Sequence, residues 1–210
     1  MKILYAASEA TPYAKSGGLA DVAFSLPPAL QKTGDDMAIV TPMYRVTQEN
    51  YGDEFERIKT CQIVLGQRRL ACSLYRGALN GVTVYAIGNE HLFHRPRLYG
   101  YGDDSLRFAF FCRAVIDLLP EFGDLPDILH CNDWETALAI LYLKNDAVLR
   151  PELSHIKTVY TIHNIAYQGQ FGRSEMEATF ALPDGWYHGG LSYEFEGRQD
   201  INLMKGAMLM

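Results

Sequence analysis

Three pairs of polar residues, each directly after an apolar run, could together form a binding site. The pairs are Ser8-Glu9, Asn132-Asp133 and His163-Asn164. The apolar runs read as strands, and ligands of open α/β sheets bind beyond the carboxyl ends of the parallel strands. Carboxylate, amide and imidazole groups can satisfy sugar hydroxyls, which both donate and accept hydrogen bonds. The sequence therefore predicts one crevice that binds a polyol.

A second feature, the run Lys15-Ser16-Gly17-Gly18 before a predicted helix, outlines a pyrophosphate site. Glycines let the backbone approach a phosphate, the helix amino terminus supplies oriented N–H groups, and Lys15 supplies a positive charge. The spacing fits equally a glycine turn that enters a helix, with Lys15 exposed to solvent. The run is neither G-x-G-x-x-G nor a P-loop, which argues against dinucleotide dehydrogenases and P-loop NTPases.

Glu9 and Asp133 are candidate catalytic carboxylates, and His163 is a candidate ligand-facing group. Asp133 also stands directly before a predicted helix, where it could cap that helix, and the two roles can coexist. His163 could equally be a loop histidine satisfied within the protein. We expect no metal and no cofactor. His130 and Cys131 are adjacent on a strand and point to opposite faces, which excludes joint metal ligation.

Strand and helix patterns alternate along the chain, which is typical of a mostly parallel sheet with helices on its faces. Apolar runs predict strands at 2–7, 37–41, 126–131 and 157–162. Apolar residues at spacings of three and four predict helices at 19–32, 104–119 and 134–143. Between Phe55 and Ile87 the period is two, which predicts an inserted three-stranded β-meander with turns at 66–68 and 79–81. The expected fold is one Rossmann-like α/β domain without repeats or linkers.

The composition is that of an ordinary globular protein, with 48% apolar and 21% charged residues. A net charge of -6 argues against nucleic-acid partners. Four cysteines without a C-x-x-C pair favour reduced thiols and a cytoplasmic location. No apolar run approaches the ~20 residues of a membrane span, and no signal peptide precedes the first strand. Residues 201–210 read as an apolar helix, from which we expect the chain to be a fragment.

Five motifs resemble those of the glycogen and starch synthases. They are KSGGLADV at 15–22, VTPMY at 40–44, HCNDWETA at 130–137, TIHNIAYQG at 161–169 and NLMKGA at 202–207. Their order spans the chain from end to end, and the combination is too specific for chance. The chain is identified as a member of the glycogen/starch synthase family.

This resemblance implies a two-lobed GT-B glycosyltransferase with its active site between two facing Rossmann-type lobes. Residues 1–210 would be the amino-terminal, acceptor-side lobe, without the second, nucleotide-binding lobe. Glucose would pass from ADP-glucose, or UDP-glucose in some members, to the non-reducing end of an α-1,4-glucan such as glycogen or a maltooligosaccharide. The anomeric configuration would be retained. The chain alone is expected to fold but not to transfer glucose.

The resemblance also implies roles for the residues that match the motifs. On the donor side these residues are Lys15, Gly17, Gly18, Asp21, His163 and Asn164. Lys15 and the backbone of the two glycines would contact the phosphates, Asp21 would support that loop, and His163 with Asn164 would hold the donor glucose.

On the acceptor side, the resemblance implies that Glu9 and Asp133 face the reacting sugars and the acceptor hydroxyl. The segment 95–101 departs from the family's usual pattern, so Tyr99 and Tyr101 are both candidates for the acceptor-side tyrosine. Trp134 is a further acceptor-side candidate, although such aromatic side chains more often pack in a core or at an edge.

Retention requires a covalent relay through a carboxylate, or attack from the face on which the leaving group departs. The resemblance implies the second route, in which the departing phosphate accepts the proton of the acceptor hydroxyl. Lys15 would stabilise the charge that builds on that phosphate, in place of Mg²⁺. The predicted catalytic residues are Lys15, Glu9, Asp133 and His163.

Three alternatives belong to other classes or families. In a glycan hydrolase, Glu9 and Asp133 would form an acid–base pair, which the predicted phosphate site argues against. A non-catalytic glucan-binding module would need no nucleotide. Another two-lobed glycosyltransferase, such as a sucrose synthase relative, is disfavoured by the run at 163–169. The choice between ADP-glucose and UDP-glucose stays open.

Overall fold

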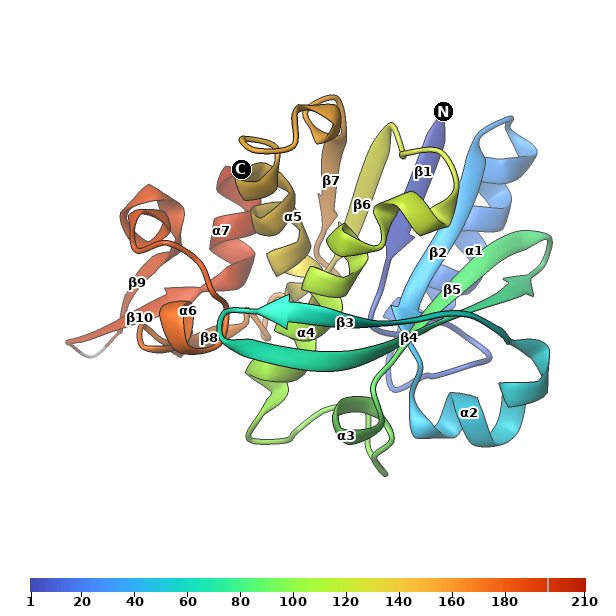
Figure 1. The fold of residues 1–210 in the computed structure, drawn as a ribbon, viewed down its shortest axis with the longest axis horizontal. Helices are drawn as coiled ribbons and strands as arrows, with labels where there is room; N and C mark the ends of the chain where they lie inside the picture. The colour runs from blue at the N-terminus through green and yellow to red at the C-terminus, as the bar shows by residue number, and fades with distance from the viewer. Residues whose placement is uncertain (196) are drawn as a thin grey trace.

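A seven-stranded sheet forms the centre of the computed structural model, which describes residues 1–195 and 197–210 (Figure 1). The strand order is β3-β4-β5-β2-β1-β6-β7. The strands are β1 Lys2–Ala6, β2 Asp36–Pro42, β3 Glu56–Leu65, β4 Arg68–Leu79, β5 Val82–Gly88, β6 Ile128–Asn132 and β7 Lys157–Thr161. Strands β5, β2, β1, β6 and β7 pair in parallel, which confirms the predicted α/β fold class.

Helices cover both faces of the parallel strands. Tyr5 of β1 packs in the layer of α1 (Leu19–Lys32), whereas its neighbour Leu4 packs in the layer of α4 (Asp104–Asp117) and α5 (Trp134–Asp146). Successive side chains of a strand point to opposite faces, so a strand covered on both sides must be apolar throughout. This is why the apolar runs located the strands.

The predicted helices all form, with small differences at their ends. Helix α1 has the predicted bounds, contains Pro27 and Pro28, and is followed by Gly34, whose φ of 106° is a left-handed value that suits glycine. Helix α4 ends two residues earlier than predicted, and a 3-10 turn, Leu119–Phe122, follows it. Helix α5 extends past the predicted end at residue 143 to Asp146.

Strands β3, β4 and β5 form the predicted meander, but it is continuous with the main sheet. Strand β4 pairs antiparallel with both neighbours, while β5 pairs parallel with β2. Asn80 and Gly81 have φ values of 51° and 86°, which suit the tight turn of a hairpin. The chain then leaves β5 through α3 (Glu90–Phe93), a route that brings the 95–104 segment to the carboxyl end of the sheet.

A second sheet lies at one end of the molecule, beyond α5 (Figure 1). It consists of β8 Gln170–Gly172, β9 Ser192–Phe195 and β10 Arg198–Asn202 in the order β8-β10-β9, and α7 (Leu203–Leu209) follows. The prediction of a helix from residue 201 was wrong at its start, because Ile201 and Asn202 pair with β8. The Asn202 side chain accepts a hydrogen bond from the Lys205 N–H and so caps α7. The sequence pattern also missed the short helices α2 (Arg45–Tyr51) and α6 (Glu175–Ala178).

The described part of the chain contains neither a membrane span nor a metal cluster. None of its helices is long and apolar enough to cross a bilayer. No group of three or more His, Cys, Asp or Glu side chains among these residues is arranged to hold a metal ion. All four cysteines are free thiols, and burial raises the pKa of Cys131 to about 12, which disfavours a thiolate nucleophile there.

Candidate active site

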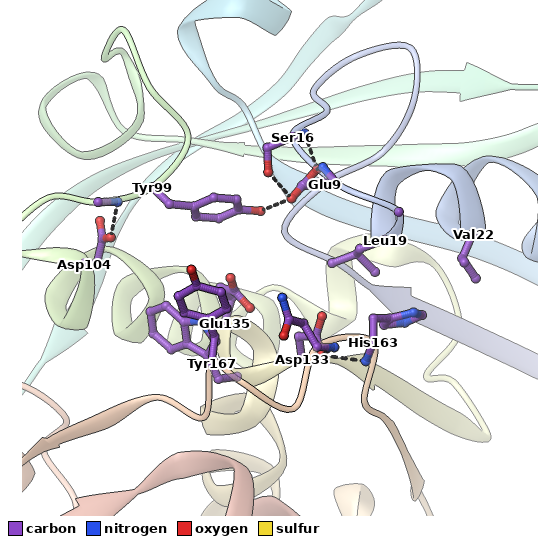
Figure 2. A pocket seen from close by; sticks show the side chains of 15 residues that line it. Glu9, Ser16, Leu19, Val22, Tyr99, Asp104, Asp133, Glu135, His163 and Tyr167 are labelled. Carbon is purple, nitrogen blue, oxygen red and sulfur yellow. Dashed lines mark hydrogen bonds between the residues drawn. The ribbon is translucent and has the colours of Figure 1, made fainter.

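The carboxyl ends of β1, β6 and β7 open into one cavity of about 840 Å³ (Figure 2). Its walls come from the loop after β1, the 99–104 segment, the start of α5 and the loop after β7. The lining residues are Glu9, Ser16, Gly17, Gly18, Leu19, Val22, Tyr99, Gly100, Asp104, Asp133, Trp134, Glu135, His163, Asn164 and Tyr167. Of the residues predicted for the site, only Lys15, Asp21 and Tyr101 are outside this lining.

Glu9 holds the glycine loop in place. Its carboxylate is buried and accepts hydrogen bonds from the backbone N–H of Ser16, the N–H of Gly17 at 3.0 Å and the Ser16 hydroxyl at 2.7 Å. The Tyr99 hydroxyl lies 2.9 Å from Glu9 Oε1 as well. These contacts occupy both oxygens, so in this structure Glu9 shapes the loop between β1 and α1.

The two glycines of this loop lie open to the cavity. A Cβ atom added at Gly17 or Gly18 would meet no other atom within 4 Å. Gly18 stands at the N-cap of α1 with an ordinary helical φ of -72°, and no side chain caps the helix there. Neither packing nor backbone conformation therefore requires glycine at residue 18. The missing side chain instead leaves the positive end of the α1 dipole accessible to an anion.

Lys15 and Asp21 form an exposed ion pair beside the loop. The Lys15 ammonium lies 2.6 Å and 2.8 Å from the two carboxylate oxygens of Asp21. This hydrogen bond holds the pKa of Asp21 below its usual value. Exposed pairs of this kind contribute little because solvent screens them, so Lys15 can exchange Asp21 for another anion at small cost.

Asp133 ties the loop after β6 to the loop after β7. Its Oδ1 accepts hydrogen bonds from the backbone N–H of His163 at 2.7 Å and of Asn164 at 3.2 Å. Its side chain makes no cap hydrogen bond to α5, so the interpretation as a helix cap was wrong. The residue has φ 57° and ψ 179°, a strained combination outside glycine. The contacts to the β7 loop stabilise this turn and fix the carboxylate at the cavity wall.

Asn132 orients His163, a role that the sequence pattern missed. The Asn132 amide nitrogen donates to the Ala6 carbonyl at 3.0 Å, which directs its amide oxygen toward His163 Nε2, 2.9 Å away. His163 therefore carries a proton on Nε2, the donor in this contact. Asn132 is fully buried. An amide as the last residue of a buried strand is the signal that could have revealed this role.

Glu135 is a second residue whose role the sequence pattern did not predict. It is the second residue of α5, lines the cavity and is only 8% exposed. Desolvation, followed by the negative charges of Asp133, Glu9 and Asp104, raises the pKa of Glu135 to about 8. The sequence signal was an acidic residue in the first turn of an otherwise apolar helix.

Tyr99 and Tyr101 occupy different positions. Tyr99 lines the cavity, and its hydroxyl is 2.9 Å from the Ser8 hydroxyl as well as from Glu9. The Tyr101 hydroxyl instead accepts the Arg97 N–H at 2.9 Å. Of the two candidate tyrosines, Tyr99 is the one that faces the cleft.

Two further aromatic side chains lie at the cleft wall. Trp134 packs edge-on against Phe108 and also contacts Phe171, so it is partly a core residue. Tyr167, which was not among the predicted site residues, lines the cavity and is 67% exposed. An exposed aromatic ring at a polar cleft is suited to stacking on a sugar.

Comparisons with known proteins show the family to which the chain belongs. Residues 2–210 match the family described as the starch synthase catalytic domain. The chain belongs to this family. It is 41% identical to the glycogen synthase of Geobacillus stearothermophilus over 211 residues, and 38% identical to that of Clostridium novyi over 210 residues. The alignments cover 100% of this chain but only 42% and 43% of those two proteins.

A solved structure supports the same family membership. The fold superposes on the catalytic domain of starch synthase IV from Arabidopsis thaliana, bound to ADP and acarbose, with a TM-score of 0.86 and 29% sequence identity. The match covers 99% of this chain and 43% of that one. The present chain therefore spans less than half the length of each of these relatives.

Proposed function

We propose that this chain serves a glycogen/starch synthase, which transfers glucose from ADP-glucose or UDP-glucose to the non-reducing end of an α-1,4-glucan with retention. The chain would be the amino-terminal, acceptor-side lobe and would act with a second lobe that binds the nucleotide. The starch synthase structure that it resembles holds ADP and acarbose, a nucleotide and a sugar-like ligand. The free cysteines are consistent with a reducing compartment, and we expect a cytoplasmic location.

The observation that carries this proposal is the presence of two kinds of subsite in one cavity. The open glycine loop at the α1 amino terminus suits a phosphate, whereas Asp133, His163 and Asn164 suit sugar hydroxyls. A glycan hydrolase or a glucan-binding module would need the second subsite only.

In the proposed reaction, Gly17, Gly18 and Lys15 bind the donor phosphates, and His163 with Asn164 orients the donor glucose. The bond between the anomeric carbon and the phosphate oxygen breaks, and the acceptor hydroxyl oxygen bonds to that carbon from the same face. The hydroxyl proton passes to the leaving phosphate oxygen. Lys15 stabilises the negative charge on that phosphate, and the exchange of Asp21 for phosphate is the step that brings Lys15 to it.

The contacts of the carboxylates support this front-face route over a covalent relay. A relay needs a carboxylate oxygen free to attack the anomeric carbon. Both oxygens of Glu9 are occupied by the loop and Tyr99, and Oδ1 of Asp133 accepts the N–H groups of His163 and Asn164, which fixes this carboxylate at the cavity wall. Glu9 therefore positions the glycine loop, and Asp133 acts better as a fixed acceptor for the sugars than as a nucleophile.

The test uses the complete protein, which contains this chain together with its second lobe. Radiolabelled ADP-glucose or UDP-glucose is incubated with glycogen, and label is counted in the polymer and in free glucose. Label that enters the polymer only with a nucleotide-sugar donor supports the proposal. Free glucose released from glucan without nucleotide would instead indicate a hydrolase. Glycogen retention without any nucleotide effect would indicate a binding module.

A further inference from the structure

The transfer scheme leaves two acidic side chains of the cleft unused, Asp104, which is paired with Arg107, and Glu135. Glu135 is nine-tenths buried, and its Oε2 has no hydrogen-bond partner among the residues that the structure describes. Figure 2 shows its carboxyl group pointing toward the side of the cleft where Glu9 and Tyr99 lie. A buried polar atom without a partner is uncommon in native proteins and calls for an explanation.

Glu135 lies on the side of the cleft away from the proposed phosphate subsite. In Figure 2, Glu135, Tyr99 and Tyr167 gather at one side, while Leu19 and Val22 of α1 lie at the other. The phosphate subsite proposed above is at the amino terminus of α1. Glu135 is therefore suited to contact the acceptor glucan.

The charges around Glu135 are almost all negative. Asp133 precedes α5, Glu9 follows β1, and Asp104 begins α4. The cation of this region, Arg107 of α4, is paired with Asp104 and donates to the Leu92 carbonyl. No positive group among the described residues forms an ion pair with Glu135.

The remaining titratable neighbours are neutral at physiological pH. They are Tyr44 before α2, Tyr99, Tyr160 of β7 and Cys112 of α4, and burial raises the pKa of each one. A carboxylate in such surroundings lacks both solvent and a counter-ion, which favours its protonated form. Unlike Glu9 and Asp133, which accept hydrogen bonds, a protonated Glu135 can donate one.

We propose that Glu135 is a glucan-binding residue, whose neutral carboxyl group donates a hydrogen bond to an oxygen of the acceptor glucan. This inference rests on the proposed function, because it takes the acceptor from there. Raising the pH ionises Glu135, removes the donor and adds a fourth carboxylate beside Glu9, Asp104 and Asp133. Since its pKa lies at about 8, glucan binding weakens as the pH rises through that value.

The test measures KM for a maltooligosaccharide with the complete protein at a series of pH values between about pH 6 and pH 10, which span this titration. Above the pKa, the KM of the wild-type protein should rise by up to about tenfold per pH unit, as the protonated fraction falls. Glu135→Gln keeps a donor that does not titrate, so its KM should stay near the neutral wild-type value and lose the alkaline rise. Glu135→Leu should raise KM at neutral pH and remove the alkaline rise.

Glu175→Gln is the matched control, because Glu175 also has a buried Oε2 without a partner in the part of the chain that the structure describes, but lies outside the cleft lining. This variant should keep the wild-type pH profile. Retention of each variant on immobilised glycogen at the same pH values gives a second readout, and melting curves confirm that the variants are folded.

A Glu135→Leu protein with wild-type KM and an unchanged alkaline rise would overturn the inference while leaving transfer itself intact. A wild-type protein that transfers no glucose to glucan would overturn the proposed function and the inference with it. The two failures are thus distinguishable.

Discussion

Replacement of Asp133 separates its contribution to folding from its contribution to transfer. Its Oδ1 accepts two backbone N–H groups, at 2.7 Å and 3.2 Å, and its φ is 57°. Asp133→Ala removes the acceptor of both hydrogen bonds, and each hydrogen bond to a charged group is worth about 1.5–3 kcal/mol, the longer one less. Alanine at a positive φ adds about 1 kcal/mol of strain. The expected loss of stability is therefore about 3–5 kcal/mol.

Asp133→Asn should lose much less stability. Asparagine keeps an acceptor oxygen at the same place and tolerates positive φ, so we expect a loss of about 1 kcal/mol or less. Removing the negative charge should still reduce glucose transfer, because the carboxylate lies at the cavity wall. The asparagine variant is thus expected to be folded and impaired.

Thermal unfolding followed by circular dichroism measures the first effect, and label transfer by the complete protein measures the second. A domain of this size loses about 2–4 °C in Tm per kcal/mol, so Asp133→Ala should melt about 6–20 °C below wild type. Asp53→Ala, at an exposed position, is the control for losing an aspartate. If Asp133→Ala and Asp133→Asn melt together with wild type, the two N–H contacts do not stabilise the turn. Normal transfer by the asparagine variant would remove the charge from the mechanism.

Three further predictions concern other residues of the cleft. Lys15→Ala in the complete protein should lower kcat/KM by roughly 10- to 150-fold, with part of the loss in kcat, and an unchanged kcat/KM would remove Lys15 from the site. Gly18→Ala should change the Tm little, because the added Cβ meets no described atom within 4 Å, yet raise KM for the nucleotide sugar; a normal KM would exclude phosphate binding at this loop. The pKa of Glu135 rises from 4.5 to about 8 on folding, so the unfolded chain releases a proton that the folded protein keeps. As the pH rises between these two values, Glu135 therefore lowers the free energy of unfolding of the wild-type protein by up to about 5 kcal/mol. Urea unfolding at both ends of the range should show a smaller fall in that free energy for Glu135→Gln. Equal falls for the two proteins would contradict the burial of a neutral acid.

The sequence located the main sheet because its strands are covered on both faces. A strand such as β1 is then apolar at every position, and the run is visible without knowledge of its partners. The same reasoning failed at Ile201 and Asn202, where pairing with β8, 30 residues or so earlier in the chain, decides the conformation. The short helices α2 and α6 were missed because one or two turns leave too little periodicity to detect.

The strand-end rule brought Glu9, Asp133 and His163 to one cavity, but it could not give their contacts. Adjacency to α5 suggested that Asp133 caps the helix, whereas its carboxylate turns toward the β7 loop. Likewise, the protonation state of Glu135 depends on its burial and on the charges of Glu9 and Asp104, which are far from it in the sequence, as well as on that of Asp133 two residues before it. Such long-range electrostatics become visible only when the fold is known.

The central claim is that one cleft holds both the donor phosphates and the glucan. Amide chemical-shift mapping on the ¹⁵N-labelled chain tests this claim most directly. Millimolar ADP should shift the N–H signals of Gly17, Gly18 and Leu19, and a maltooligosaccharide should shift those of Trp134, Glu135 and Asn164, all residues of one cavity. Both sets should shift together when the two ligands are present. Shifts confined to another surface, such as the hollow between Gln67 and Arg173, or ADP shifts that leave the glycine loop untouched, would contradict the account.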